Sequence, residues 1–291
     1  MPIPVSKHRL RSSAFERQDE VIKVDASRLF FLSVEGDETE RNYFEHLSEH
    51  LDNSLVKIEV LRHRRGDGYS DPNYVIELLT EYLNIRDGEL IPDDLLQKLV
   101  DKYTKDVLDA YLSNSDTITK ITRKSIEDDL LLLGIDMNYR RYLQNMKTHS
   151  DDVFAVILDR DCGNHSRELM EKCVQKCQDN GFGCFITNPC FEFWLLLHLR
   201  DVKSVYSEED LAAMLENQKI SNAHTVVSKE VCNYASHGKK ISSKKFEKFY
   251  LPNIASAMAH ANDFASDYPD LLDRLGTNLP KLLCLLVSPK V

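Results

Sequence analysis

Two short acidic segments of this chain could bind a divalent metal ion. Glu35 follows the apolar run at 29–34, and Asp159 and Asp161 follow the apolar run at 153–158. Side chains alternate along a strand, so we expect Asp159 and Asp161 to point the same way. Carboxylates held close together raise each other's pKa unless a cation neutralises them, and Mg²⁺ and Mn²⁺ prefer such oxygen ligands. The spacing therefore predicts a Mg²⁺ or Mn²⁺ site.

The elements that position these acids follow from the pattern of apolar residues. A short apolar run that stops at carboxylates is typical of a parallel strand whose C-terminal end opens into a crevice. Two further strands are predicted over 54–61, near an edge of the sheet, and over 184–187. Strands and helices alternate along the chain, which predicts an α/β fold with a doubly wound, mostly parallel sheet flanked by helices.

The remaining segments have helical spacing. Helices are expected at 39–51, 72–83, 165–180, 188–198, 208–218, 223–236 and 244–266, the last bent at Pro252. The aromatic residues and His198 of 188–198 are expected in the core. The segment 84–149 is rich in charges and leucine, with periodic stretches at 95–112 and 126–143 and no strand-like run. We interpret it as a helical insertion that divides a main domain (27–83 and 150–291), preceded by a basic tail (1–26).

Composition and charge limit the classes of protein. The chain has 291 residues, 42% of them hydrophobic, and no apolar stretch near the ~20 residues that a membrane span needs, so we expect no membrane association. The basic N-terminus lacks the apolar core of a secretory signal, which favours the cytoplasm. A formal net charge of −10 argues against nonspecific coating of nucleic acid. Basic residues nevertheless cluster at 7–11, 62–65 and 239–248, either as solvated surface or as a track for a phosphate backbone.

Three motifs that occur in this order resemble the RloB-like family, a branch of the Toprim superfamily. They are Glu35–Phe44, Asp159–Asp161 and Asn188–His198, and the segment Gly276–Leu282 resembles that family's C-terminal signature. The resemblance covers about 27–83 and 150–287. It implies a Rossmann-like Toprim fold in which a glutamate after the first strand and an Asp-x-Asp after a later one bind Mg²⁺. OLD-type nucleases, topoisomerases and primases contain such domains.

The resemblance also implies roles for individual residues. The expected metal ligands are Glu35, Glu40, Asp159, Asp161 and Glu192, and the expected catalytic residues are Glu35, Asp159, Asp161, Glu192 and Lys281, with Lys281 facing the developing charge on a phosphate. Each has a structural alternative. Glu35 and the two aspartates could simply begin turns, and Lys281 could be solvated. Asp37 and Glu40 have the spacing of a helix capping box, and Glu192 could be stabilised by a helix dipole alone.

The function that follows from the resemblance is two-metal-type hydrolysis of nucleic-acid phosphodiesters, in DNA or in RNA, tRNA included. A bacterial anti-phage role (abortive infection) beside an AAA-type ATPase partner is expected on the same ground, and a homo-oligomer is left open. Two alternatives remain at this point. One is a non-catalytic Toprim-like regulatory subunit of a defence ATPase. The other is a haloacid-dehalogenase-like phosphatase, which is disfavoured because Gly163 stands where that family has Thr or Val.

Overall fold

A mostly parallel sheet forms the centre of the computed structural model, which describes residues 28–36, 38–52, 55–62, 71–147, 149–235 and 240–287. Within these residues the five strands have the order β2-β1-β3-β4-β5. They are β1 (Arg28–Val34), β2 (Val56–Val60), β3 (Val153–Asp159), β4 (Gly183–Asn188) and β5 (Gly276–Thr277). Only β5 pairs antiparallel. The predicted α/β fold is confirmed, and β2 lies at the edge, as expected.

The order of the strands reverses between β1 and β3. From β1 the chain passes to β2 on one side, and it then returns to add β3 and β4 on the other side. The register pairs Val34 with Ile157 and Asp159 with Thr187, so the C-terminal ends of β1, β3 and β4 meet at one edge of the sheet. Open α/β sheets bind their ligands outside the strand ends at such a reversal.

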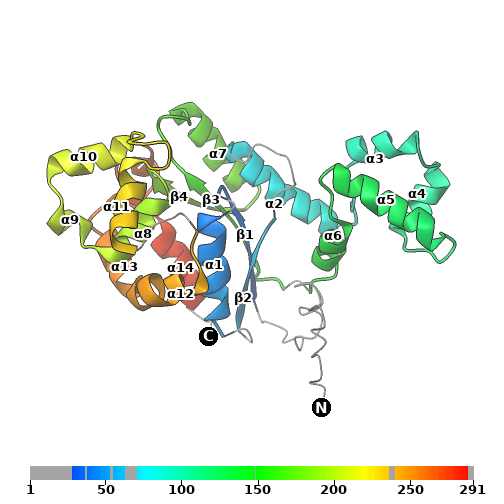
Figure 1. Ribbon diagram of the computed structural model, residues 1–291, viewed down its shortest axis with the longest axis horizontal. Coiled ribbons are helices and arrows are strands. Elements are labelled where there is room, and N and C mark those ends of the chain that lie inside the picture. The colour runs from blue at the N-terminus through cyan, green and yellow to red at the C-terminus, as the bar shows by residue number, and fades with distance from the viewer. Residues whose placement is uncertain are drawn as a thin grey trace, which may run out of the picture.

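Helices cover both faces of the sheet because alternate strand residues are apolar on each face. Phe30 and Leu32 belong to one core, and Leu29 and Phe31 belong to the other. The first core is closed by α1 (Thr39–Glu49), α8 (Phe191–Leu199), α11 (Val226–Ala235), α13 (Ile254–Ala261) and α14 (Leu279–Val287). The second is closed by α2 (Pro72–Arg86) and α7 (Arg167–Asp179), which lie across the sheet from α1 and α14 in Figure 1.

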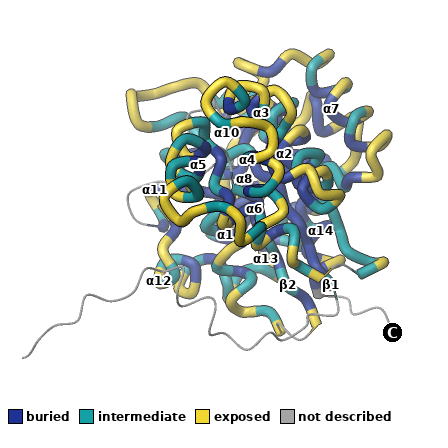
Figure 2. Tube along the Cα trace, turned by 90° about the vertical axis from the view of Figure 1, so that its right-hand side faces the viewer, coloured by how far each residue is buried: buried dark blue, intermediate teal, exposed yellow. Residues whose placement is uncertain are grey.

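Helix α8 is buried along nearly its whole length because its sequence is apolar on every side. Of its two polar residues, Glu192 is half-buried and His198 is only 3% exposed. Its Nδ1 donates to the carbonyl of Trp194 at 2.9 Å, and its Nε2 lies 3.1 Å from the Tyr43 hydroxyl. Burial lowers the pKa of His198 to about 4, so the imidazole is neutral. The predicted core position of this segment is confirmed, and Figure 2 shows buried segments running through the middle of the molecule.

The segment between β2 and β3 is helical. After α2 it forms α3 (Asp93–Val100), α4 (Lys105–Leu112), α5 (Lys120–Leu132) and α6 (Met137–Gln144), and α3, α4 and α5 extend away from the sheet in Figure 1. Each of the two predicted periodic stretches is split into two helices. Local signals explain the second split: Gly134 has φ +81°, and the Asp136 side chain accepts the N–H groups of Asn138 and Tyr139 to start α6.

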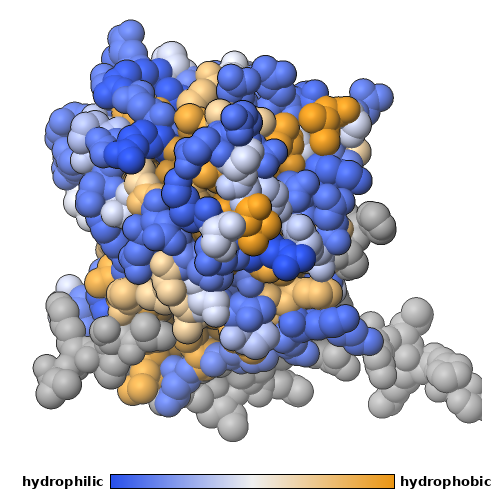
Figure 3. Space-filling view, turned by 90° about the vertical axis from the view of Figure 1, so that its left-hand side faces the viewer, coloured by the Kyte–Doolittle hydropathy of each residue, from blue (hydrophilic) through white to orange (hydrophobic). Residues whose placement is uncertain are grey.

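The C-terminal part adds short helices around α8. They are α9 (Val202–Val205), α10 (Glu208–Glu216) and α12 (Ser243–Lys245), and α12 continues through a π-helical turn (Phe246–Tyr250) and a 3₁₀ turn (Leu251–Asn253) into α13. The expected bend at Pro252 is therefore confirmed. The face seen in Figure 3 carries mainly hydrophilic side chains with smaller hydrophobic groups between them. Within the described ranges, no helix has the length and apolar character that crossing a membrane demands.

Candidate active site

The strand ends bring Glu35 and Asp159 into direct contact. Glu35 follows β1, Asp159 ends β3, and these strands are neighbours with a parallel register. The backbone N–H of Asp159 donates to Oε2 of Glu35 at 3.1 Å. The Glu35 side chain is only 13% exposed. Two carboxylates that lie 124 residues apart in the chain therefore share the point where the strand order reverses.

The start of α8 completes the surroundings of Asp159. The N–H of Phe191 donates to Oδ1 of Asp159 at 2.8 Å. The N-cap residue of α8 is Cys190, whose side chain makes no capping bond, so Asp159 accepts a helix N–H that would otherwise lack a partner. Asn188, at which the predicted helix 188–198 begins, instead ends β4. Glu192 is thus the second residue of α8, beside Asp159.

Glu40 is the fourth carboxylate of this group. It lies on the first turn of α1 and is 5% exposed. A Cβ atom added to Gly36 would lie 1.9 Å from Oε2 of Glu40, so the absence of a side chain at Gly36 lets the carboxylate pack against the loop after β1. The N-cap residue of α1 is Glu38, with no side-chain capping bond, and Asp37 lies outside the described residues.

The pKa values of Glu35 and Asp159 are raised because these carboxyl groups are buried and close to other acids. The pKa of Glu35 is raised to about 8, chiefly by burial and also by the charges of Glu40, Asp161 and Asp71, while the bond from the Asp159 N–H opposes the change. Burial also holds the pKa of Asp159 well above its usual range, assisted by the charges of Glu40, Glu35 and Glu192. We call these four carboxylates the acid cluster: Glu35, Glu40, Asp159 and Glu192. They repel one another in a place that water reaches poorly.

Asp161 does not continue the strand, contrary to the expectation from the sequence. The strand ends at Asp159, and Asp161 has φ +31°, so strand alternation does not extend to it. Its N–H donates to the Pro189 carbonyl at 2.8 Å, and its carboxylate accepts from the Asn164 side chain at 2.7 Å. The reasoning from alternation was wrong at this position, although the charge of Asp161 still raises the pKa of Glu35.

Three further residues belong to the site and were missed by sequence reasoning. His165 is buried, with Nε2 3.7 Å from Oε1 of Glu35 and Nδ1 donating to the Asp159 carbonyl at 3.2 Å. Arg160 is also buried and holds the loop by donating to the carbonyls of Leu272 and His165. Asp71 caps α2 and adds charge near Glu35. Asp71 lies just before the predicted helix 72–83, and a lone histidine at the start of the predicted helix 165–180 carries no periodic signal.

Lys281 is not brought to the acid cluster. It lies on α14 with its side chain 52% exposed, and its Nζ pairs with Oδ1 of Asp267 at 2.6 Å. Asp267 is itself exposed, with its pKa lowered by that lysine. In the described part of the chain, the interactions of Lys281 are therefore those of a surface residue, which is the alternative given above.

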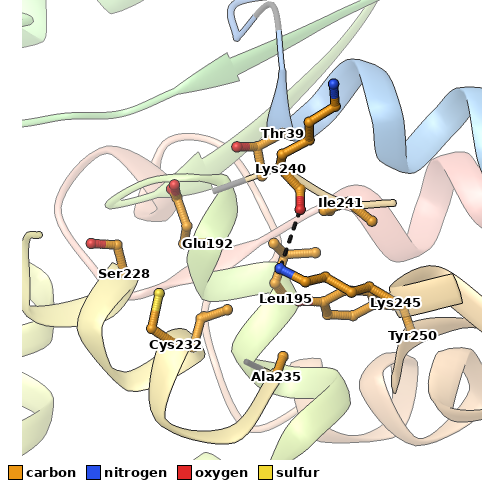
Figure 4. Close-up of a pocket in the computed structure, with 11 residues that line it drawn as sticks. Thr39, Glu192, Leu195, Ser228, Cys232, Ala235, Lys240, Ile241, Lys245 and Tyr250 are labelled. Carbon is orange, nitrogen blue, oxygen red and sulfur yellow. Dashed lines mark hydrogen bonds between the residues drawn. The ribbon is translucent and has the colours of Figure 1, made fainter. Parts of the chain in front are cut away.

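A pocket adjoins the acid cluster on the side of α11. Thr39 and Glu192 contribute to its wall, Lys240 closes it from the segment before α12, and Lys245 closes it from α12 itself (Figure 4). The remaining lining residues are Leu195, Ser228, Val231, Cys232, Ala235, Ile241 and Tyr250. Lys240 and Lys245 of the predicted basic cluster 239–248 thus lie beside Glu192. Residue 239 of that cluster, residues 63–65 of the second cluster and all of the cluster 7–11 lie outside the described residues.

The donor atoms of the acid cluster suit Mg²⁺ or Mn²⁺, because they are carboxylate oxygens whose mutual repulsion a cation would relieve. The geometry is not that of an assembled site. Among the residues that the structure describes, no group of three or more His, Cys, Asp or Glu side chains is arranged to hold a metal ion. Two carboxylates instead accept backbone N–H groups through one oxygen each, so the other acidic side chains would have to reorient around an ion.

Comparison with known proteins places the chain in a family. The family model described as RloB-like protein matches residues 30–286, which include both strand ends, α8 and the helices between β2 and β3. No curated protein and no solved structure is similar enough to match. Because the family match covers most of the 291 residues, this chain belongs to the RloB-like protein family.

Proposed function

We propose that this protein is a nuclease that uses Mg²⁺ or Mn²⁺ to hydrolyse phosphodiester bonds in nucleic acid. One observation carries the proposal: four carboxylates, from the ends of β1 and β3 and from the first turns of α1 and α8, gather where the strand order reverses, and the pKa values of Glu35 and Asp159 are raised there. Carboxylates held close enough to repel one another are typical of sites that bind a cation or exchange a proton.

Each residue of the site then has a defined task. A bound divalent ion supplies a water of lowered pKa and stabilises charge on the attacked phosphate. The Phe191 N–H and the Asp159 N–H orient one carboxylate each, which leaves the other oxygen of Asp159 for a ligand, while the other oxygen of Glu35 lies 3.7 Å from Nε2 of His165. With a pKa of about 8, Glu35 holds its proton at neutral pH and releases it when a cation arrives. His165 contacts Glu35 through Nε2 and donates to the Asp159 carbonyl through Nδ1, which restrains both groups.

A second candidate is a non-catalytic Toprim-like subunit that regulates an ATPase. The observation that favours it is the lack, in the described residues, of three ligands already converging on one point. Metal binding separates the two candidates, because a regulatory subunit has no need of the charge that the acid cluster carries.

The setting of the reaction is proposed from the family alone. Membership of the RloB-like family and the resemblance to Toprim nucleases support a role in bacterial anti-phage defence, by abortive infection, with an AAA-type ATPase as partner. DNA and RNA, tRNA included, remain the candidate substrates, and the cytoplasm is the expected compartment.

The test is a cleavage assay with purified full-length protein. Plasmid, single-stranded DNA and tRNA are incubated with and without Mn²⁺, beside a variant that combines Asp159→Ala with Asp161→Ala. We expect Mn²⁺-dependent cleavage that the double variant lacks. Calorimetric titration with Mn²⁺ adds a readout that needs no substrate. Cleavage that survives the double substitution would overturn the proposed site, and the absence of both Mn²⁺ binding and cleavage would favour the regulatory candidate.

A further inference from the structure

Two tyrosines of α6 form an aromatic surface on the edge strand β2. The rings of Tyr139 and Tyr142 are stacked, with centroids 6.2 Å apart and an angle of 25° between their planes. Tyr139 is buried against the core, whereas Tyr142 is 41% exposed. The inner ring therefore supports an outer ring that solvent reaches.

Two cations border these rings. The Arg62 guanidinium lies 4.7 Å from the centre of the Tyr139 ring, and the Lys57 ammonium lies 5.8 Å from the centre of the Tyr142 ring. Lys57 also donates to the Tyr142 hydroxyl at 3.1 Å. That hydroxyl donates in turn to the Glu59 carboxylate at 3.1 Å, which fixes the direction of the ring. We call Lys57, Arg62, Tyr139 and Tyr142 the edge patch.

The edge patch begins beside the acid cluster. The N–H of Leu61 donates to the carbonyl of Leu32, so Arg62 lies next to the end of β1, from which Glu35 continues. Neighbouring strands are about 5 Å apart. Lys57 lies five residues back along β2, or roughly 17 Å at strand spacing. The edge patch thus runs from the strand ends along the outer edge of the sheet.

We propose that the edge patch binds an unpaired segment of the substrate nucleic acid, with a base stacked on Tyr142 and phosphates near Lys57 and Arg62. The inference deepens the proposed nuclease function and rests on it. Alternation of an exposed aromatic ring with cations is how proteins hold single strands, because every unpaired base presents a flat face and every linkage a charge. In a duplex the bases are stacked on one another, so their faces cannot reach Tyr142.

The test compares Tyr142→Ala with Tyr142→Phe, each in the full chain that also carries Asp159→Asn. Fluorescence anisotropy in EDTA then measures binding of labelled single-stranded DNA, single-stranded RNA and duplex DNA without cleavage. We expect Tyr142→Ala to weaken single-strand binding by about fivefold or more, the effect of one lost base stack. Tyr142→Phe keeps the ring and should bind nearly as the parent does. Equal melting temperatures of the two variants exclude a folding defect.

The possible outcomes separate this inference from the proposed function. Single-strand binding that is equal in the two Tyr142 variants, or duplex binding as tight as single-strand binding, would overturn the role of the edge patch and leave the nuclease proposal standing. If Tyr142→Ala alone loses single-strand binding while the parent protein cleaves nothing with Mn²⁺, the edge patch is supported and the nuclease proposal fails.

Discussion

The substitution Glu35→Gln should make the free energy of unfolding less dependent on pH. A carboxyl group whose pKa is raised in the folded state holds its proton more tightly there than in the unfolded chain. Its contribution to stability is therefore full at low pH and is lost as the pH rises from about 4.5, the ordinary value, to about 8, the value in the folded protein. At about 1.4 kcal/mol for each pH unit, the loss amounts to at most roughly 5 kcal/mol.

Glutamine has the same shape, can accept the Asp159 N–H, and carries no proton to lose. In EDTA we expect urea unfolding to show similar stabilities at pH 5 and an advantage of several kcal/mol for Glu35→Gln at pH 9. Glu45→Gln is the matched control, since Glu45 is an exposed residue of α1 that pairs with Arg41. A difference between Glu35→Gln and the parent that stays constant from pH 5 to pH 9 would refute the reasoning about burial.

Two further predictions concern the neighbours of the acid cluster. Gly36→Ala should displace the Glu40 carboxylate, weaken Mn²⁺ binding in calorimetry and lower the free energy of unfolding by about 1–3 kcal/mol, whereas Gly163→Ala, whose added Cβ would lie 3.6 Å from Asp161, should be tolerated. Unchanged Mn²⁺ affinity in Gly36→Ala would contradict the packing argument. Lys281→Ala should keep both Mn²⁺ binding and cleavage, because Lys281 pairs at the surface with Asp267. Loss of cleavage in that variant would instead restore the role that family resemblance implies.

The four parallel strands and the principal helices were predictable because each depends on local signals, whereas the two-residue strand β5 was not predicted. The apolar run before Asp159 could only be a buried strand, and the apolar helix after Pro189 had to lie in the core. The long periodic stretch 126–143 was wrongly left undivided, since periodicity persists across a short turn while Gly134 and the Asp136 cap interrupt the backbone. Local chemistry rather than the apolar pattern decided that boundary.

The site was predictable only in part, because its contacts join distant segments. Parallel strand ends place Glu35 beside Asp159 for any sequence of this topology, so that pair followed from the fold class. The positions of His165 and Lys281 depend on how a loop and the last helix pack, which no spacing in the sequence reveals. Asp161 was expected to point the same way as Asp159 by strand alternation, but its backbone turns just after the strand ends, and within the described residues only its charge links it to Glu35.

The bond from Phe191 to Asp159 ties one carboxylate of the site to the least accessible helix of the molecule. Phe191, Trp194 and Leu197 of α8 are fully buried, so this helix cannot fray locally, and its first N–H groups open only when the core itself opens. The position of the Asp159 carboxylate is therefore held by a helix that opens only on global unfolding, and not by a loop. Adjustment of the site to an ion or a strand then falls on Glu40, which α1 carries, and on Asp161, which a turn carries.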